Sequence, residues 1–347
     1  MQAPAVSIII PTKDRSALLR PALDSLLAQS LRAWEAIIVD DGSADDTAAF
    51  VCSLAKSDSR FRFLHRARNP AGAPTCRNIG LDHAEAPAVL FLDSDDLLAP
   101  TCLAGRLAAL EARPHADFIV ANGEIFRQTP GDLNRFWSTF DSRNDLDRFL
   151  RGDSVWATPG VLWRRDKLRG INGWTEGLER WQDWELHIRA QCRQLRYHKL
   201  PLSDYYIRRS EEDGISASDH RPQGLAQRVI TMAAAMKELR SSPVATPERE
   251  AILATLAFDT YVLLTKSSQA RRLGVPAWKT FRRARGNHLA DRLFTAIAPI
   301  VSRSAPESLL SQRLYRRWNR TPHAPANRLH CNATHIAFDG DASTALA

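Results

Sequence analysis

Residues 6–121 alternate short apolar runs with helical patterns, and this alternation limits the possible folds more than any other feature of the chain. The apolar runs predict strands at residues 6–10, 35–39, 61–64, 88–92 and 117–121. Between them, the spacing predicts helices near residues 18–29 and 45–56, a third that carries residues 77–80, and a fourth after Pro100. Such alternation is typical of a parallel sheet covered by helices on both faces.

The first two predicted helices carry signals at their starts. Pro21 is expected in the first turn of the helix at residues 18–29, where a proline is tolerated because the first amides have no partner inside the helix. Ser43 and Asp46 resemble a capping box, in which two side chains accept hydrogen bonds from the first amides of a helix. We therefore expect the second helix to begin near Asp45.

Two of the predicted strands end in carboxylates. Residues 88–92 lead directly into Asp93-Ser94-Asp95-Asp96, and residues 35–39 lead into Asp40 and Asp41. Ligands of open α/β sheets bind at the carboxyl ends of strands. Closely spaced carboxylates repel one another, and a divalent cation with oxygen ligands relieves that repulsion. The acidic run after residue 92 indicates either a cation site that also holds a diphosphate or a solvated acidic turn.

Absent motifs and the cysteine pattern exclude several classes of protein. The sequence has no G-x-G-x-x-G and no P-loop motif, which argues against a dinucleotide-binding dehydrogenase and a P-loop NTPase. The five cysteines form no C-x-x-C pair, so they indicate neither a zinc site nor a disulfide framework, and they suit a reducing compartment. There is no signal-peptide pattern and no apolar run of membrane-spanning length. We expect a cytoplasmic protein.

Several motifs, taken in order, resemble those of glycosyltransferase family 2. They are Pro11-Thr12-Lys13-Asp14, Val39-Asp40-Asp41-Gly42-Ser43, residues 69–80 and Asp93-Ser94-Asp95-Asp96, and the resemblance extends over residues 6–216. Members of that family are inverting sugar transferases of the GT-A fold. The resemblance implies a Rossmann-like mixed α/β sheet and a nucleotide-diphosphate sugar as donor, with a UDP-sugar as the first expectation.

The resemblance also implies roles for individual residues. It assigns nucleotide-sugar binding to the motifs at the strand ends and to the helix after the third strand, at Pro11, Thr12, Asp14, Asp41, Arg77, Asp93 and Ser94. Asp95 would hold Mn²⁺ or Mg²⁺. Arg77 has an alternative, which is to pair with a neighbouring carboxylate. For Asp40, base binding and an Asp-Gly turn with a helix cap remain equal alternatives.

A second group of candidate residues lies on the acceptor side. The family carries a Glu-Asp pair at the start of a helix here, with the aspartate as the base; this chain has Gln182 followed by Asp183. Asp183 is therefore the candidate base, and its alternative is a helix cap. Indole rings stack on sugar rings, and Trp174, Trp181 and Trp184 cluster around the candidate base in the sequence, so they are candidates for acceptor binding. The alternative is that they are core aromatics.

A closing segment completes the resemblance. Arg208 and Ser216 occupy positions where the family places a basic residue and a serine near the donor diphosphate; a surface strand and a turn are the alternatives. The Q-x-x-R-W signature of processive members is absent, which favours a single addition. We expect the glycosyltransferase domain to span residues 1–220.

Residues 221–320 are predicted to form a helical, basic region, and residues 321–347 a disordered tail. Helical patterns cover residues 224–239 and 247–273, and much of the net charge of +8 lies beyond them, where arginines alternate with aromatic residues. This composition suits, in our order of preference, an anionic membrane surface, packing against the catalytic domain, or nucleic acid. We expect no nucleic-acid partner, and a peripheral position on the inner face of the membrane.

The sequence thus predicts a metal-dependent glycosyltransferase of cell-surface polysaccharide or glycolipid synthesis. It would move a sugar to a hydroxyl of a carbohydrate or lipid-linked acceptor. Two alternatives stay open: a nucleotidyltransferase, which shares the acidic metal site, and a non-catalytic module that binds nucleotide sugars, for which Gln182 is the hint.

Overall fold

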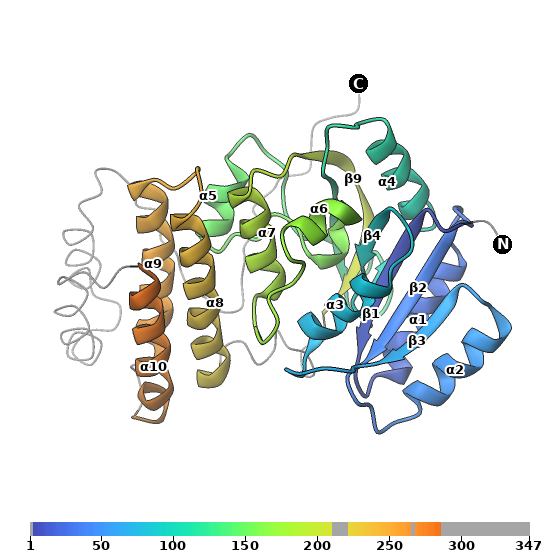
Figure 1. Ribbon diagram of the computed structural model, residues 1–347, viewed down its shortest axis with the longest axis horizontal. Helices are drawn as coiled ribbons and strands as arrows, with labels where there is room; N and C mark the ends of the chain where they lie inside the picture. The colour runs from blue at the N-terminus through green and yellow to red at the C-terminus, as the bar shows by residue number, and fades with distance from the viewer. Residues whose placement is uncertain (1–2, 210–220, 265–267, 286–347) are drawn as a thin grey trace.

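The computed structural model describes residues 3–209, 221–264 and 268–285 (Figure 1). At its centre is a nine-stranded sheet with the order β3-β2-β1-β4-β8-β6-β9-β5, and β7 pairs with β6. The first four strands are parallel to one another, at β1 (Val6–Thr12), β2 (Trp34–Asp40), β3 (Phe61–His65) and β4 (Ala88–Phe91). These four match the strands that the sequence predicted.

The second half of the sheet is mixed. Strand β8 (Val161–Arg164) lies between β4 and β6 (Phe118–Phe126) and is antiparallel to both. Strand β9 (Tyr197–Arg208) pairs in parallel with β6, and the short strands β5 (Leu97–Leu98) and β7 (Arg135–Phe136) add antiparallel pairs. The alternation up to residue 121 predicted an all-parallel sheet, which is wrong beyond β4 because β8, from later in the chain, inserts there. The mixed sheet implied by the family resemblance is confirmed.

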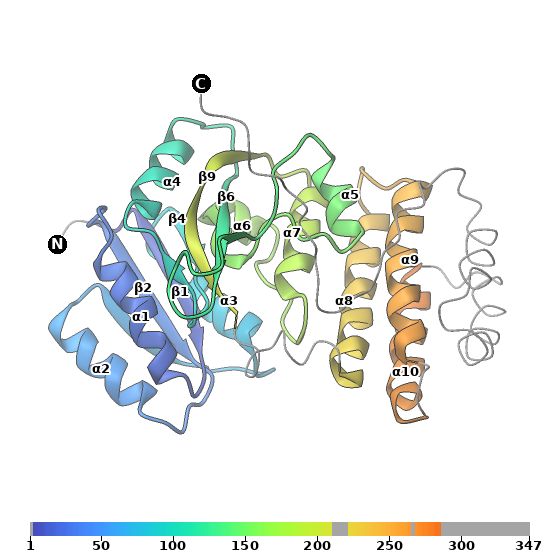
Figure 2. The same ribbon diagram turned by 180° about the vertical axis from the view of Figure 1, so that it is seen from behind.

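Helices cover both faces of the sheet, because alternate residues of its strands point to opposite sides. Val6, Ile8 and Ile10 of β1 face one core with α1 (Ser16–Leu27), α2 (Thr47–Ser57) and α4 (Cys102–Glu111). Ile9 faces the other core with α3 (Ala73–His83) and α7 (Gln182–Cys192). Figure 2 shows α1, α2 and α4 on the near side. Shorter elements connect the layers, at α5 (Asp145–Leu150), a 3-10 turn (Thr158–Gly160) and α6 (Arg165–Gly170).

The predicted starts of α1 and α2 need correction. Helix α1 begins at Ser16, so Pro21 lies inside the helix and removes one backbone hydrogen bond there. Helix α2 begins after Asp46, whose side chain makes no capping hydrogen bond. The Ser43 hydroxyl instead donates to Asp40, because the loop folds back on the end of β2.

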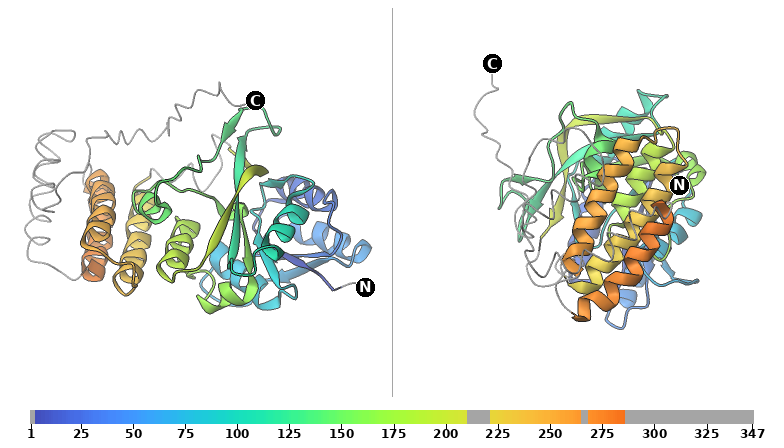
Figure 3. Two further views of the ribbon diagram at one scale, coloured as in Figure 1. Left: turned by 90° about the horizontal axis from the view of Figure 1, so that it is seen from above. Right: turned by 90° about the vertical axis from the view of Figure 1, so that its left-hand side faces the viewer.

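Three further helices stack beside α7, at α8 (Pro222–Arg240), α9 (Pro247–Leu264) and α10 (Ser268–Arg285). Figure 3 shows α8 next to α7, with α9 and α10 together on its far side. One apolar core continues from the sheet to Phe281 in α10. The single helix predicted over residues 247–273 is wrong, because α9 ends at Leu264 and α10 begins at Ser268. The predicted tail and most of the basic tract lie outside the described residues.

Helix α10 separates its aromatic and basic residues. Trp278 and Phe281 are buried, and Trp278 stacks on Tyr261 of α9 with 4.9 Å between ring centroids. The side chains of Lys279 and Arg283 are exposed. For these aromatic residues the packing alternative is therefore correct. Within residues 3–209, 221–264 and 268–285, no helix combines the length and the apolar character needed to cross a membrane.

Candidate active site

The loops after β1 and β2 are locked together by hydrogen bonds. Asp14, with φ of 50°, donates its amide to Ser43 Oγ (2.9 Å) and accepts the Ala44 amide at Oδ1 (2.6 Å). The buried Asp40 carboxylate accepts the amides of Gly42 (3.2 Å) and Ser43 (3.0 Å). For Asp40 the structure therefore shows the turn that was one of its two alternatives, and Asp14 braces the same turn.

Asp41 and Thr12 lie side by side at the ends of β2 and β1. The Asp41 amide donates to the Thr12 carbonyl (2.8 Å), and the Asp41 carboxylate accepts from Arg66. The Thr12 hydroxyl is buried and has no hydrogen-bond partner among the residues that the structure describes. A buried hydroxyl without a partner costs about 1–3 kcal/mol, so the position suits a ligand that supplies the partner. Base binding by Pro11, Thr12 and Asp41 stays a prediction.

The carboxylates after β4 point to three different partners. Asp93 Oδ1 accepts from Arg77 (2.6 Å), and Asp95 Oδ2 accepts from Arg15 (2.9 Å). Asp96 is buried and accepts the amide of Arg208 (3.0 Å). Ser94, between them in sequence, is buried as well. Each carboxylate of the run therefore has its own cationic or amide donor within the protein.

Two of these carboxyl groups have raised pKa values. Burial, followed by the negative charge of Asp93, raises the pKa of Asp95. Burial, followed by the charges of Asp95 and Asp93, raises the pKa of Asp96 well above its usual range. Burial is the larger cause of both shifts, and crowded negative charge is the second, which a divalent cation would relieve.

The donor set at this position fits a magnesium- or manganese-type ion held together with a substrate. No group of three or more acidic, histidine or cysteine side chains with metal-binding geometry occurs in the described part of the chain. Ions of this type are commonly held by one or two carboxylates plus substrate phosphates. About a quarter of the Asp95 side chain is exposed, and a third of the Asp93 side chain. Of the two, Asp95 would hold the ion.

Arg77 of α3 joins the acidic run to the start of α7. Its Nη2 donates to Asp93 (2.6 Å), and its Nη1 donates to the Gln182 side-chain oxygen (2.8 Å). The Arg77 side chain is only 6% exposed, so its guanidinium is largely shielded from water. The alternative in which Arg77 pairs with a carboxylate is what the structure shows. At the position of the family's glutamate, Gln182 still supplies a side-chain oxygen that accepts from Arg77, but it carries no negative charge.

Asp183, the candidate base, is the second residue of α7. Its Oδ1 accepts the Trp184 amide (2.9 Å), one of the first helix amides that lack a partner in the helix. Asp183 thus binds a free amide in the first turn, as the capping alternative expected. The N-cap residue itself, however, is Trp181. Burial raises the pKa of Asp183, the Asp93 charge raises it further, and Arg77 lowers it. Asp183 therefore feels the charges of Asp93 and of Arg77, which bonds to Gln182 next to it in sequence.

Two of the three candidate acceptor tryptophans lie in the core. Trp174 is 3% exposed, meets Phe91 edge-on (5.1 Å between centroids) and has the Arg77 guanidinium 4.2 Å from its ring centroid. Trp184 is 1% exposed and donates its indole N–H to the Phe149 carbonyl (2.7 Å). The acceptor role predicted for these two is not supported, because neither ring presents a face to a sugar. Trp181 is partly buried, and its role stays a prediction.

Arg208, near the end of β9, lies beside the acidic run. Its Nε donates to the Asp95 carbonyl (3.2 Å), and its Nη1 donates to the Arg127 carbonyl (2.9 Å). In this arrangement the guanidinium braces two loops, and phosphate contact stays a prediction. Ser216 lies outside the described residues.

A family model described as Glycosyl transferase family 2 matches residues 7–195, more than half of the chain. The chain belongs to this family. The match includes the loops after β1, β2 and β4 and the start of α7. It therefore confirms the family that the sequence motifs indicated.

Curated relatives share this part of the chain. The protein is 33% identical over 135 residues to a GalNAc(5)-diNAcBac-PP-undecaprenol beta-1,3-glucosyltransferase of Campylobacter jejuni, covering 39% of the chain and 42% of the relative. It is 34% identical over 220 residues to the putative glycosyltransferase EpsH of Bacillus subtilis, covering 60% and 62%. A PGL/p-HBAD biosynthesis glycosyltransferase of Mycobacterium bovis is 30% identical over 190 residues, covering 55% and 71%. The chain thus spans less than two thirds of the first two relatives.

Solved structures confirm the GT-A fold. TarS residues 1–349 from S. aureus, in complex with UDP-GlcNAc, superpose with a TM-score of 0.65 at 19% identity, covering 91% of each chain. The mannosyltransferase PcManGT of Pyrobaculum calidifontis, with GDP-Man and Mn²⁺, gives a TM-score of 0.51 at 17% identity, covering 92% of this chain and 87% of that one. At such identities the likeness concerns the fold alone.

The family motifs did not indicate two arginines of the site. Arg15 and Arg66 pair with the carboxylates of Asp95 and Asp41. Each follows a strand end closely, Arg15 after β1 and Arg66 directly after β3. A basic residue just beyond a strand of a parallel sheet is a signal that could have identified both arginines. The carboxyl ends of parallel strands meet at one edge of the sheet, where the acidic loops also lie.

Proposed function

We propose that this family member transfers a sugar from a UDP-sugar to a hydroxyl of a carbohydrate or lipid-linked acceptor, with inversion at the anomeric carbon. The observation that carries the proposal is the bridge made by Arg77. It ties Asp93, on the donor side, to Gln182, the residue before Asp183. The candidate donor-binding residues and the candidate base thereby share one site.

The residues of this site would divide the work by position. Asp183 would accept the proton of the acceptor hydroxyl, since its raised pKa makes it a stronger base than an exposed aspartate. Asp93 would meet the ribose, and Thr12 and Asp41 the base. Mn²⁺ or Mg²⁺ held at Asp95 would supply positive charge opposite the departing diphosphate. Arg77 would keep Asp93 and Gln182 in place during the reaction.

A binding and product assay tests the donor and the outcome. We expect UDP with Mn²⁺ to raise the unfolding temperature more than GDP or ADP does at the same concentration, because the nucleotide with the lowest Kd stabilises the fold most. A ligand at a hundred times its Kd adds roughly 2.7 kcal/mol to the free energy of unfolding. UDP-glucose and UDP-N-acetylglucosamine are the first donors to test, and NMR of the product reports the anomeric configuration. A retained configuration would contradict inversion. Diphosphate release from a nucleoside triphosphate would favour a nucleotidyltransferase, and binding without any turnover would favour a non-catalytic module.

We also propose that the basic face of α10 contacts an anionic membrane on its cytoplasmic side, where a lipid-linked acceptor would lie. Support comes from the exposed side chains of Lys279 and Arg283 and from the relative that, by its name, acts on an undecaprenol-linked substrate. Polysaccharide or glycolipid synthesis at the cell surface would follow from such an acceptor.

Neutralising two cations of α10 should weaken membrane binding. Because each Lys or Arg near an anionic surface contributes on the order of 1 kcal/mol, Lys279→Gln with Arg283→Gln should lower affinity for phosphatidylglycerol vesicles by roughly 30-fold at low salt. Arg32→Gln with Lys56→Gln removes two exposed cations from the α/β domain and serves as the control. Vesicle sedimentation measures both. Equal loss in the two pairs, or no binding by the unaltered protein, would assign the α10 face to solvent.

A further inference from the structure

Helix α8 holds the two residues that immediately precede α7. The Thr231 hydroxyl donates to the Arg180 carbonyl (2.7 Å), with the Gln227 carbonyl of its own helix farther away (3.1 Å). The Arg228 guanidinium lies 3.9 Å from the centroid of the Trp181 ring. Thr231 and Arg228 are three positions apart and so lie on one face of α8. The helical region therefore contacts the chain directly before the helix of Asp183.

Trp181 has a backbone conformation that its surroundings must maintain. It is the N-cap residue of α7, with φ of 55° and ψ of 35°, in the left-handed region. This region is unfavourable for a residue with a side chain, and it persists only where neighbouring structure holds it. The direction in which α7 leaves this turn fixes where Asp183, two residues later, lies. Contacts to Trp181 thus bear on the position of the candidate base.

The other side of Trp181 meets the loop after α5. A Cβ on Gly152 would lie 3.6 Å from the Trp181 ring and 3.3 Å from Leu256 of α9, so the three residues are closely packed. The centroid of the Trp184 ring is 5.2 Å from that of Trp181. Trp181 thus packs between Trp184 of α7, the loop after α5 and Arg228 of α8.

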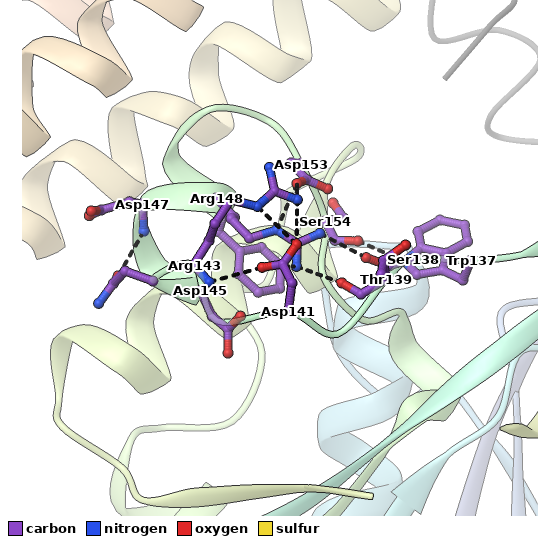
Figure 4. A network of polar contacts seen from close by, with 12 residues as sticks. Trp137, Ser138, Thr139, Asp141, Arg143, Asp145, Asp147, Arg148, Asp153 and Ser154 are labelled. Carbon is purple, nitrogen blue, oxygen red and sulfur yellow. Dashed lines mark hydrogen bonds and ion pairs between the residues drawn. The ribbon is translucent and has the colours of Figure 1, made fainter. Parts of the chain in front are cut away.

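The loop that contains Gly152 is itself fixed by the buried side chain of Arg148 (Figure 4). Arg148 donates to Asp153 (2.8 Å), to the Thr139 carbonyl (2.7 Å) and to Ser138 Oγ (3.0 Å). Buried charge-assisted hydrogen bonds of this kind are among the stronger ones in proteins. The loop is therefore a firm support on one side of Trp181, and α8 is the support on the other.

We propose that Thr231 and Arg228 are positioning residues for sugar transfer, which hold the left-handed turn at Trp181 and thereby set the orientation of Asp183. This inference rests on the proposed function, because it takes Asp183 as the base. A base must lie within hydrogen-bond reach of the proton it accepts. A displacement of about 1 Å, even from a change far from the chemistry, can cost roughly 100-fold in rate. Helix α8 is in this sense part of the active site.

The decisive variant is Thr231→Val, which keeps the shape of the side chain and removes the bond to Arg180. Thr260→Val is the matched control, because Thr260 is buried in α9 and its hydroxyl bonds to Leu256 of the same helix (2.9 Å). We expect Thr231→Val, unlike Thr260→Val, to speed hydrogen exchange of the amides of residues 182–185. The same variant should lower the rate of UDP release from UDP-glucose or UDP-N-acetylglucosamine by roughly 10-fold. UDP affinity should stay within about twofold, since Thr231 acts on α7 and not on the donor loops. Thr231→Ser should restore both properties.

Each result has a defined meaning. Wild-type exchange and turnover in Thr231→Val, or the same changes in Thr260→Val, would overturn the proposal. Should Thr231→Val fail to fold, Arg228→Met takes its place with the same expected results, because it removes the guanidinium from the Trp181 ring and keeps an aliphatic side chain. Faster exchange with normal turnover also overturns the positioning role, provided that Asp183→Asn is inactive. If Asp183→Asn is active, the proposed function has failed instead, and the exchange data still report whether α8 holds the turn.

Discussion

Asp183→Asn should lose nearly all sugar transfer while it keeps the fold and the affinity for UDP. An acceptor hydroxyl is a poor nucleophile at neutral pH, and a positioned base contributes roughly 10²- to 10⁴-fold to the rate. Asparagine has almost the shape of aspartate, and its side-chain oxygen can still accept the Trp184 amide, but it cannot take up the proton. UDP release measured with each UDP-sugar donor gives the loss, and calorimetry with UDP gives the affinity.

The control and the contrary outcome follow from the neighbours of Asp183. Glu179→Gln removes an exposed carboxylate shortly before α7 and should leave transfer unchanged. Glu185, the next carboxylate along α7, is buried and bonded to Arg189 (2.8 Å) and Thr175 (2.9 Å). Near-normal turnover in Asp183→Asn would therefore remove the first turn of α7 from the chemistry altogether.

The pH dependence of transfer offers a second measurement on the same residue. Burial and the Asp93 charge raise the pKa of Asp183, whereas Arg77 lowers it. A base works only when deprotonated, so activity should fall as the pH falls through this raised pKa. The acidic limb of the pH–rate profile should thus lie above the range of an exposed aspartate. It should disappear from whatever activity remains in Asp183→Asn.

The strands of the first half could be predicted because their signal is local. The runs at residues 6–10 and 35–39 are each apolar at four of five positions, as expected for strands with helices on both faces. The order of the sheet could not be predicted in the same way. Strand β8 lies between β4 and β6 in the sheet. In the sequence, however, about 70 residues separate β8 from β4, and 34 residues separate it from β6. No pattern within a short window specifies such a pairing.

The site shows the same division. The motif residues could be named from the sequence, but their partners could not. Arg15 reaches Asp95 from another strand end, 80 positions away, and Arg77 reaches Gln182 across 105 positions. The tryptophans show the limit most clearly, because an indole suits a core and a sugar platform equally well. Only the surrounding contacts place Trp184 in the core.

Asp95→Asn should lower the affinity for UDP in the presence of Mn²⁺ by roughly 100-fold and leave binding without a divalent ion nearly unchanged. Loss of residues that merely support metal ligands costs 10- to 100-fold, so loss of a ligand should reach the upper end of that range. An amide oxygen carries no net charge and is a weaker ligand for a hard cation than a carboxylate. Calorimetry with UDP, in Mn²⁺ and in EDTA, measures the two affinities.

Arg15→Gln is the matched control for this prediction. In the structure Asp95 is paired with Arg15, so Asp95→Asn also breaks an ion pair, and the control breaks the same pair from the other side. If Asp95 serves only that pair, the two variants should behave alike. If it holds the ion, Arg15→Gln should keep the dependence on Mn²⁺. Metal affinity should also fall as the pH falls through the raised pKa of Asp95, because the ion binds the deprotonated carboxylate. Unchanged Mn²⁺-dependent binding in Asp95→Asn would return this residue to a structural role at the end of β4.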